Sequence, residues 1–353
     1  MSSTEENVVS LPAPHPRPPL DTLRRPLTDL RISVMDRCNF RCPYCMPEDE
    51  YPRDHEFLSK AERLRFEEIE RLARIFVDLG VRKLRLTGGE PMLRRDLPEL
   101  VRQLAAIPGL ADLAMTTNGS LLAGKAEALR AAGLKRITLS LDTIDPKTFG
   151  VMSGGRGDVA DIFAAIDAAE RAGFSPLKIN AVVMRGVNDG QAVDLVEHFR
   201  GTPHIVRFIE YMDVGTCNDW RKELVVPSAE LRERIGARWP LVELEANYGG
   251  EVARRYAFAD GGGEIGFISS VTEPFCGDCT RARLSADGKL YTCLFAQTGH
   301  DLRAPLRAGA SDAELEALIG ARWRQRADRY SELRADLRAA GNPEKVEMYT
   351  IGG

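Results

Sequence analysis

The sequence predicts an α/β fold in which an open, partial barrel of six β/α units precedes a smaller α+β domain. Short aliphatic or β-branched runs alternate with helical patterns between residues 30 and 211. Such alternation is typical of a parallel sheet covered by helices on its outer face. Six units are fewer than the eight of a closed barrel, so we expect a TIM-like barrel that stays open. A length of 353 residues agrees with two domains.

The six strand patterns share a high content of Val, Ile and Leu and cover residues 30–35, 82–88, 110–117, 136–142, 177–184 and 205–211. Helical patterns between them cover 120–133, 158–173 and 189–199. A further helix is predicted after Ser59, because Glu62 three residues later completes a capping box, and Gly80 ends it.

After residue 240 the pattern changes to short strands separated by glycine-rich turns, at 251–258, 264–270, 280–285 and 289–294. Two helices follow, one of them opened by a capping box of Ser311 and Glu314. We therefore divide the chain into a disordered proline-rich tail (1–22), a partial barrel (23–240) and a C-terminal domain (241–353). The final Gly352-Gly353 is either a frayed end or a functional tail.

Charge and hydropathy exclude several classes of protein. Lys and Arg number 48 against 52 Asp and Glu, a net charge of −4, which argues against nucleic-acid binding in bulk. No apolar run is long enough for a membrane span, and the N-terminus lacks a signal peptide pattern. We expect a cytoplasmic protein without membrane or nucleic-acid partners.

Six of the seven cysteines form two groups of three. Cys38, Cys42 and Cys45 follow the first predicted strand, where a (β/α) barrel carries its chemistry. A structural zinc ion needs four protein ligands, and the nearest histidine is His55. A [4Fe–4S] cluster bound by three thiolates leaves one iron open for chemistry. This triplet therefore favours a catalytic iron–sulfur cluster.

The second predicted strand ends in Gly88-Gly89-Glu90. The glycines allow close backbone approach to a ligand, and Glu90 offers an acceptor for an ammonium group. Together with Tyr44 inside the cysteine triplet, this pattern resembles the radical S-adenosylmethionine (radical SAM) superfamily. The resemblance implies that the open iron chelates SAM, and that one-electron reduction releases methionine and a 5′-deoxyadenosyl radical.

Cys276, Cys279 and Cys293 form the second triplet, for which zinc with His300 as fourth ligand is the alternative. Arg281 and Arg283 follow Cys279 within this triplet. With the runs DRCNFRCPYCMP, LRLTGGEP, TTNG, SLD, KIN and RFIEYMD, this placement is similar to the GTP 3′,8-cyclase family of molybdenum cofactor biosynthesis. The resemblance implies a second [4Fe–4S] cluster whose free iron contacts the guanine of GTP.

The same resemblance implies site residues. Those implied for SAM are Tyr44, Gly88, Gly89, Glu90, Ser140 and Met212. Those implied for GTP are Arg31, Arg85, Thr116, Lys178, Arg207, Arg281 and Arg283, the last two also being catalytic candidates with the first cysteine triplet. Independently, Lys and Arg on the strands of a helix-covered sheet need anionic partners, and a triphosphate supplies roughly four negative charges.

The activity implied is a lyase reaction in which the radical abstracts the 3′ hydrogen of GTP. The resulting carbon radical attacks C8 of guanine, and reduction then gives 3′,8-cyclo-7,8-dihydro-GTP. The product would pass to cyclic pyranopterin monophosphate synthase. The sequence leaves the electron donor and the oligomeric state open, and a homodimer is compatible with it. Cys217 belongs to neither triplet, and we interpret it as a buried or incidental thiol.

Two other functions remain open at this point. One is a radical SAM enzyme that modifies peptides or proteins with the help of an auxiliary cluster, although such enzymes typically carry more C-terminal cysteines. The other is a non-catalytic module stabilised by zinc, which would be colourless where two clusters would be brown.

Overall fold

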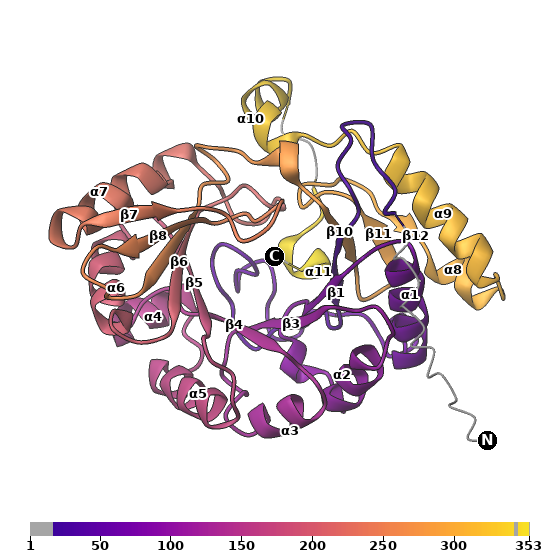
Figure 1. Cartoon of the computed structure of the whole chain (residues 1–353), viewed down its shortest axis with the longest axis horizontal. Helices are drawn as coiled ribbons and strands as arrows, with labels where there is room; N and C mark the ends of the chain where they lie inside the picture. The colour runs from indigo at the N-terminus through magenta and orange to yellow at the C-terminus, as the bar shows by residue number, and fades with distance from the viewer. Residues whose placement is uncertain (1–16, 342–344, 353) are drawn as a thin grey trace, which may run out of the picture.

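One sheet curls into an open barrel and carries every strand described below (Figure 1). The computed structural model describes residues 17–341 and 345–352. Within them, twelve strands are hydrogen-bonded in the order β12-β11-β10-β1-β2-β3-β4-β5-β6-β9-β8-β7. The strands from β10 through β1–β6 to β9 are parallel, and antiparallel strands extend both edges. The predicted α/β partial barrel is confirmed.

The six central strands are β1 (Asp29–Ser33), β2 (Lys83–Thr87), β3 (Asp112–Thr117), β4 (Arg136–Ser140), β5 (Lys178–Val183) and β6 (Ile205–Glu210). The edge strands are β7 (Leu241–Leu244), β8 (Arg254–Phe258), β9 (Glu264–Ile268), β10 (Arg281–Leu284), β11 (Lys289–Tyr291) and β12 (His300–Asp301). All ten predicted strands are present, and β7 and β12 are additional.

The helices that cover the barrel are α1 (Phe66–Asp78), α2 (Leu97–Ala105), α3 (Ala126–Ala131), α4 (Pro146–Met152), α5 (Val159–Arg171), α6 (Ala192–Phe199) and α7 (Ser228–Arg238). The C-terminal helices are α8 (Arg303–Arg307), α9 (Asp312–Arg324), α10 (Tyr330–Ala339) and α11 (Met348–Ile351). The Ser311–Glu314 capping box opens α9 as predicted.

Two predicted helix starts were wrong. Ser59 and Glu62 do exchange hydrogen bonds, but only within a turn, and α1 begins at Phe66 after a second box of Arg65 and Glu68. The backbone N–H of Leu64 donates to Ala286 O (2.8 Å) instead of continuing a helix. Similarly, residues 120–125 form turns, since the Asn118 side chain accepts from Ser120, and α3 starts later.

The strands of the barrel present two faces with different chemistry. On β1, Leu30 and Ile32 are buried in the core shared with the outer helices, whereas Arg31 lines a cavity inside the barrel. Arg85 on β2 and Arg207 on β6 repeat this inward placement. The outward faces supply the apolar burial that stabilises the sheet, which leaves the inward face available for polar side chains.

Residues beyond the expected barrel boundary at 240 extend the barrel sheet itself, since β9 pairs with β6 and β10 pairs with β1. At the N-terminus, residues 1–16 of the expected disordered tail lie outside the described residues. The chain is ordered before the expected boundary at 22, because Asp21 is buried and accepts hydrogen bonds from Arg25. None of the described helices is long and apolar enough to span a bilayer.

A buried carboxylate at the end of β6 holds the C-terminal region to the barrel. Asp213 accepts from Tyr330 Oη (2.6 Å), Arg334 Nε (2.8 Å) and Lys345 Nζ (3.0 Å). Burial alone would raise the pKa of Asp213, but these partners hold it below its usual value. Two buried cations therefore depend on one carboxylate.

Replacing Asp213 by Asn is expected to lower the free energy of unfolding by roughly 3–5 kcal/mol at pH 7, because Arg334 and Lys345 would stay buried without a counter-charge. A carboxylate whose pKa is lower in the folded state contributes stability at pH values above its unfolded pKa of about 3.9. This contribution is lost as the pH falls through the folded pKa. The difference between Asp213→Asn and wild type should therefore shrink below about pH 4. Anaerobic denaturant unfolding across pH measures it, with the exposed Asp336→Asn as control.

Candidate functional site

The loop that carries the first cysteine triplet is held against the end of β2 by backbone contacts. Gly89 N–H donates to Met35 O (2.7 Å), and Glu90 N–H donates to Arg37 O (2.8 Å). A Cβ at Gly88 would overlap Met35 O, and one at Gly89 would overlap Arg37 O. The two glycines are thus required for the close approach of two backbones, which fixes the loop just before Cys38.

The three thiols of this loop are enclosed. Cys38 Sγ lies within 3.4 Å of Phe40 N and 3.8 Å of Asn118 Nδ2, which point N–H groups toward it. Burial raises the pKa of Cys38 to about 11, with Glu90 adding to the effect, and burial likewise raises the pKa of Cys42 and Cys45. Deprotonation of three such thiols requires a cationic centre, so the donor set is suited to a metal cluster.

Zinc is not favoured by the arrangement of ligands. Within residues 17–341 and 345–352, no three Cys, His, Asp or Glu side chains converge on a position for a single ion. The ring of His55 packs between Tyr51 and Phe57, with centroids 4.9 and 4.7 Å away. An iron–sulfur cluster does not demand convergence, since each thiolate binds a different iron.

The residues expected to contact SAM surround this loop. Tyr44 Oη donates to Asp142 Oδ2 (2.8 Å), and burial raises the pKa of Asp142 to about 6. Glu90 is buried and already accepts from Met92 N, Thr117 Oγ1 and Asn118 N at 2.7–2.9 Å. These bonds tie Glu90 to the end of β3, so a direct contact with an ammonium group stays a prediction.

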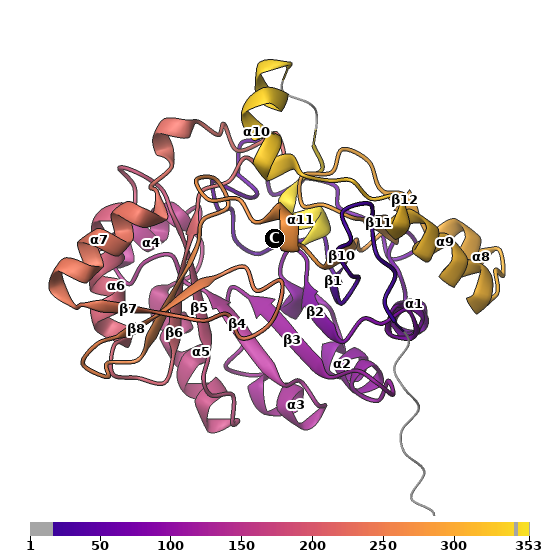
Figure 2. The same ribbon diagram turned by 45° about the horizontal axis from the view of Figure 1, so that its top comes forward.

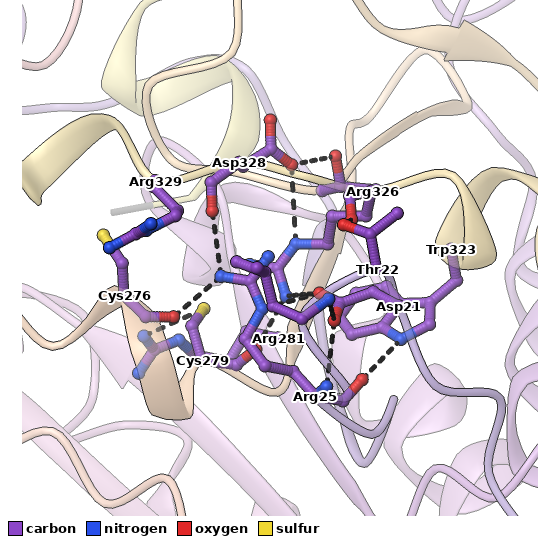
Figure 3. Close-up of polar contacts among 12 residues, drawn as sticks. Asp21, Thr22, Arg25, Cys276, Cys279, Arg281, Trp323, Arg326, Asp328 and Arg329 are labelled. Atoms are coloured by element: carbon purple, nitrogen blue, oxygen red, sulfur yellow. Dashed lines mark hydrogen bonds and ion pairs between the residues drawn. The ribbon is translucent and has the colours of Figure 1, made fainter. Parts of the chain in front are cut away.

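Two arginines donate hydrogen bonds to backbone carbonyl groups of the loop that carries Cys276 and Cys279 (Figure 3). Arg25 Nη1 donates to Cys276 O and Arg326 Nη1 donates to Cys279 O, both at 2.7 Å. Asp21 bonds both arginines, at 2.6 and 3.3 Å. The N-terminal segment and the end of α9 therefore fix the position of these cysteines.

Cys279 is electrostatically different from the other ligand candidates. Burial would raise the pKa of its thiol, but Arg281 and Arg326 lower that pKa to about 6. Arg281 Nη2 lies 3.2 Å from Cys279 Sγ. A thiolate is therefore favoured here at neutral pH, as a metal ligand requires.

A cavity inside the barrel joins the second triplet to the inward-facing cations. It encloses about 1350 Å³ of empty space, including its mouth toward solvent. The predicted residues that line it are Arg31, Arg85, Thr116, Arg207, Met212, Arg281, Arg283, Cys276, Cys279 and Cys293. Residues from six strands or strand ends thus meet at one place. Lys178 is not among the lining residues.

The five lining arginines of the strands have no carboxylate within 4 Å among the described residues. Arg85 donates to Thr116 and Thr138, and Arg207 donates to Asn180 Oδ1 (2.7 Å). Burial, then repulsion from Arg283, Arg281 and Arg85, lowers the pKa of Arg31 well below its usual value. Burial and Arg85 lower the pKa of Arg207 to about 9. A bound polyanion would relieve this repulsion.

The last described segment contacts the wall of this cavity, and both views place α11 beside β1 and β10 (Figures 1 and 2). Arg283 Nη1 donates to Ile351 O (3.2 Å) and to Gly352 O. A Cβ at Gly352 would overlap the Thr87 side chain, so glycine is required there. The tail is packed rather than frayed as far as Gly352; Gly353 lies outside the described residues.

Sequence reasoning missed several residues of the site. Asn180, Lys83 and Tyr248 line the cavity. Asn118 and Asp142 contact Cys38 and Tyr44, and both stand in the quoted TTNG and SLD runs, where they could have been found.

Comparison with known proteins identifies the architecture. Residues 32–199 match the radical SAM superfamily, and residues 204–332 match the family described as Molybdenum Cofactor Synthesis C. Among solved structures, Streptococcus suis SuiB bound to S-adenosylmethionine matches with a TM-score of 0.56 at 19% identity, over 83% of this chain and 68% of the other. SuiB bound to its precursor peptide SuiA matches with a TM-score of 0.59 at 17% identity, over 84% and 67%. The fold and the first cysteine loop define a radical SAM enzyme, which supports SAM and an iron–sulfur cluster as its cofactors.

Curated relatives show to which family of radical SAM enzymes the chain belongs. A protein of Xanthomonas axonopodis pv. citri, named GTP 3′,8-cyclase, is 60% identical over 95% of this chain and 99% of its own length. Proteins of the same name from Acidothermus cellulolyticus and Staphylococcus carnosus are 55% and 45% identical, over 96% and 94% of this chain and 99% and 98% of their own lengths. The chain belongs to the GTP 3′,8-cyclase family.

Replacing Gly89 by Ala is expected to lower the iron content per chain, because a Cβ would push the Arg37–Cys38 backbone away from β2. Gly124→Ala is the matched control, since nothing lies within 4 Å of a Cβ there. Iron and absorbance after anaerobic reconstitution measure the effect. Wild-type iron in Gly89→Ala would show that the contact does not position the cysteines.

Proposed function

We propose that this chain is a GTP 3′,8-cyclase that converts GTP to 3′,8-cyclo-7,8-dihydro-GTP at the start of molybdenum cofactor biosynthesis. The observation that carries the proposal is a set of five arginines that have no carboxylate partner among the described residues and surround a cavity that the second cysteine triplet also lines; they are Arg31, Arg85, Arg207, Arg281 and Arg283. A nucleoside triphosphate supplies the missing negative charge at one end and a base for the metal centre at the other.

Cys38, Cys42 and Cys45 would hold one [4Fe–4S] cluster, and Cys276, Cys279 and Cys293 a second. The first cluster with SAM supplies, when bound, an electron and a carbon radical able to abstract hydrogen. Met212 lines the substrate cavity one residue before Asp213, so it would contact SAM where the two sites meet. Tyr44, Ser140 and the Gly88–Glu90 segment complete the surroundings of the first loop.

The arginines have separable tasks. Arg281 is next to the Cys279 thiolate and Arg283 reaches the tail, so this pair orients a ligand between the second triplet and the C-terminus. Arg31 and Arg85 lie on paired strands at the same level of the sheet, with matched Cα positions. Two guanidinium groups at one level form a cradle for adjacent phosphates.

The proposal also covers the location of the enzyme, its electron donor and the enzyme that receives its product. The enzyme would work in the cytoplasm, accept electrons from a donor of unknown identity and pass its product to cyclic pyranopterin monophosphate synthase. A homodimer is compatible with this scheme.

Anaerobic reconstitution followed by an assay of 5′-deoxyadenosine with SAM and reductant tests the function. We expect GTP, but not ATP, to stimulate deoxyadenosine formation and to yield the cyclised product. Peptide substrates should have no effect, whereas a peptide-modifying enzyme would be indifferent to GTP.

In the same assay, Arg281→Ala and Arg283→Ala should each raise the Kd for GTP by about 10- to 100-fold, since each removes a charged hydrogen-bond donor. Iron content should stay at the wild-type level. Arg324→Ala, an exposed arginine on α9, is the control and should bind GTP normally. Unchanged GTP affinity in both cavity variants would overturn their assignment to the substrate.

The proposal predicts that GTP affinity depends on the protonation state of Lys178. Burial and the nearby Arg207 lower the pKa of this amine to about 8. A triphosphate would favour the charged form, so GTP affinity should be fully present below about pH 8 and should fall as the pH rises through that value. Lys178→Met should bind GTP more weakly at pH 7 and lose the pH dependence, which a titration of KM against pH measures. Exposed Lys147→Met is the control.

A further inference from the structure

The loop between β7 and β8 (residues 245–252) lies across the open side of the barrel (Figure 2). Its flanking strands are at one edge of the sheet, yet Tyr248 reaches Lys83 on β2. Lys83 Nζ is 2.7 Å from Tyr248 Oη and 4.1 Å from the ring centroid. The loop thus bridges strands that are far apart in the order of the sheet.

The same loop is seated on the segment that follows the second cysteine pair. Gly250 has φ +85°, and a Cβ there would be 2.8 Å from Asp278 O and 3.1 Å from Thr280 Oγ1. Only glycine combines that backbone conformation with such a close approach. The loop therefore covers the gap between the two edges of the open barrel.

The loop is part of the cavity wall but is weakly held. Tyr248, Gly250 and Val252 line the cavity beside Lys83. Within the described residues, the Lys83–Tyr248 contact is the hydrogen bond that joins this loop to the far side of the barrel; its other bonds run within the loop or to Arg255. Tyr248 is 44% exposed. A segment with few buried contacts opens at low cost.

We propose that the loop 245–252 is a substrate-responsive cover of the cavity and that Tyr248 contacts the phosphate chain of the bound nucleotide. Lys83 is held by a neutral phenol and by Asp29 at 3.3 Å. A phosphate attracts an ammonium group more strongly than a phenol does. When the nucleotide enters, Lys83 pairs with phosphate and the Tyr248 hydroxyl donates to a phosphate oxygen, which closes the loop over the ligand. This inference rests on the proposed function.

The reconstituted protein tests it with a series of guanosine, GMP, GDP and GTP. Tyr248→Phe should raise the Kd for GTP about fivefold, as expected for the loss of one hydrogen bond. Tyr248→Ala should raise it about tenfold, and both factors should shrink toward one for guanosine. Exposed Val242→Ala on β7 is the control.

Hydrogen–deuterium exchange of the wild-type protein provides a readout that does not depend on a variant. Residues 245–252 should gain protection with GTP and not with guanosine. Equal loss of affinity for GTP and guanosine in the Tyr248 variants, or unchanged exchange in this loop with GTP bound, would overturn the cover while leaving the proposed function intact. A wild-type protein that binds no GTP would overturn both.

Discussion

The structure depends on burying positive charge inside the barrel without pairing it. In most folds a buried arginine is matched by a carboxylate, as Arg334 is matched by Asp213 here. Arg31, Arg85 and Arg207 instead have neutral hydrogen-bond partners or none among the described residues, so burial and mutual repulsion lower their pKa values. The apolar outward faces of the same strands supply the stability that this arrangement costs. The fold therefore favours the binding of an anion inside the barrel.

A second constraint is the close contact of backbones at the strand ends. Gly88 and Gly89 allow the first cysteine loop to lie directly against β2, and Gly352 allows the C-terminal segment to lie against Thr87 at the end of the same strand. One strand end thus positions both the first cysteine loop and the tail. A side chain at any of the three glycines would separate parts that must stay within reach of one another.

The sequence predicted the strands well because each is a short aliphatic run with clear boundaries, and it predicted the cysteine triplets because their spacing is a chemical signature. It missed α2, although Leu97, Leu100, Val101 and Leu104 have helical spacing and are buried. It misplaced the start of α3, where side-chain bonds of Asn118 compete with the helix.

Tyr248 could not be predicted, because its position depends on how far the sheet curls and hence on long-range packing. Lys178 was predicted to contact GTP, but it does not line the cavity. It is the first residue of β5, and Asn180, two residues later on the same strand, lines the cavity instead.

The contact between the tail and Arg283 shows how the site keeps its charge available. The carbonyl groups of Ile351 and Gly352 accept hydrogen bonds from the guanidinium, so the buried cation is solvated by dipoles. A carboxylate in that position would solvate Arg283 equally well, but it would cancel the charge that an anionic substrate requires. The carbonyls of Ile351 and Gly352 accept from Arg283 Nη1 without adding a negative charge. Because Lys345 ties the tail to Asp213, directly after Met212, the placement of these carbonyls is coupled to the end of β6. The position of the segment 345–352 is therefore part of the electrostatic environment of Arg283 in the cavity wall.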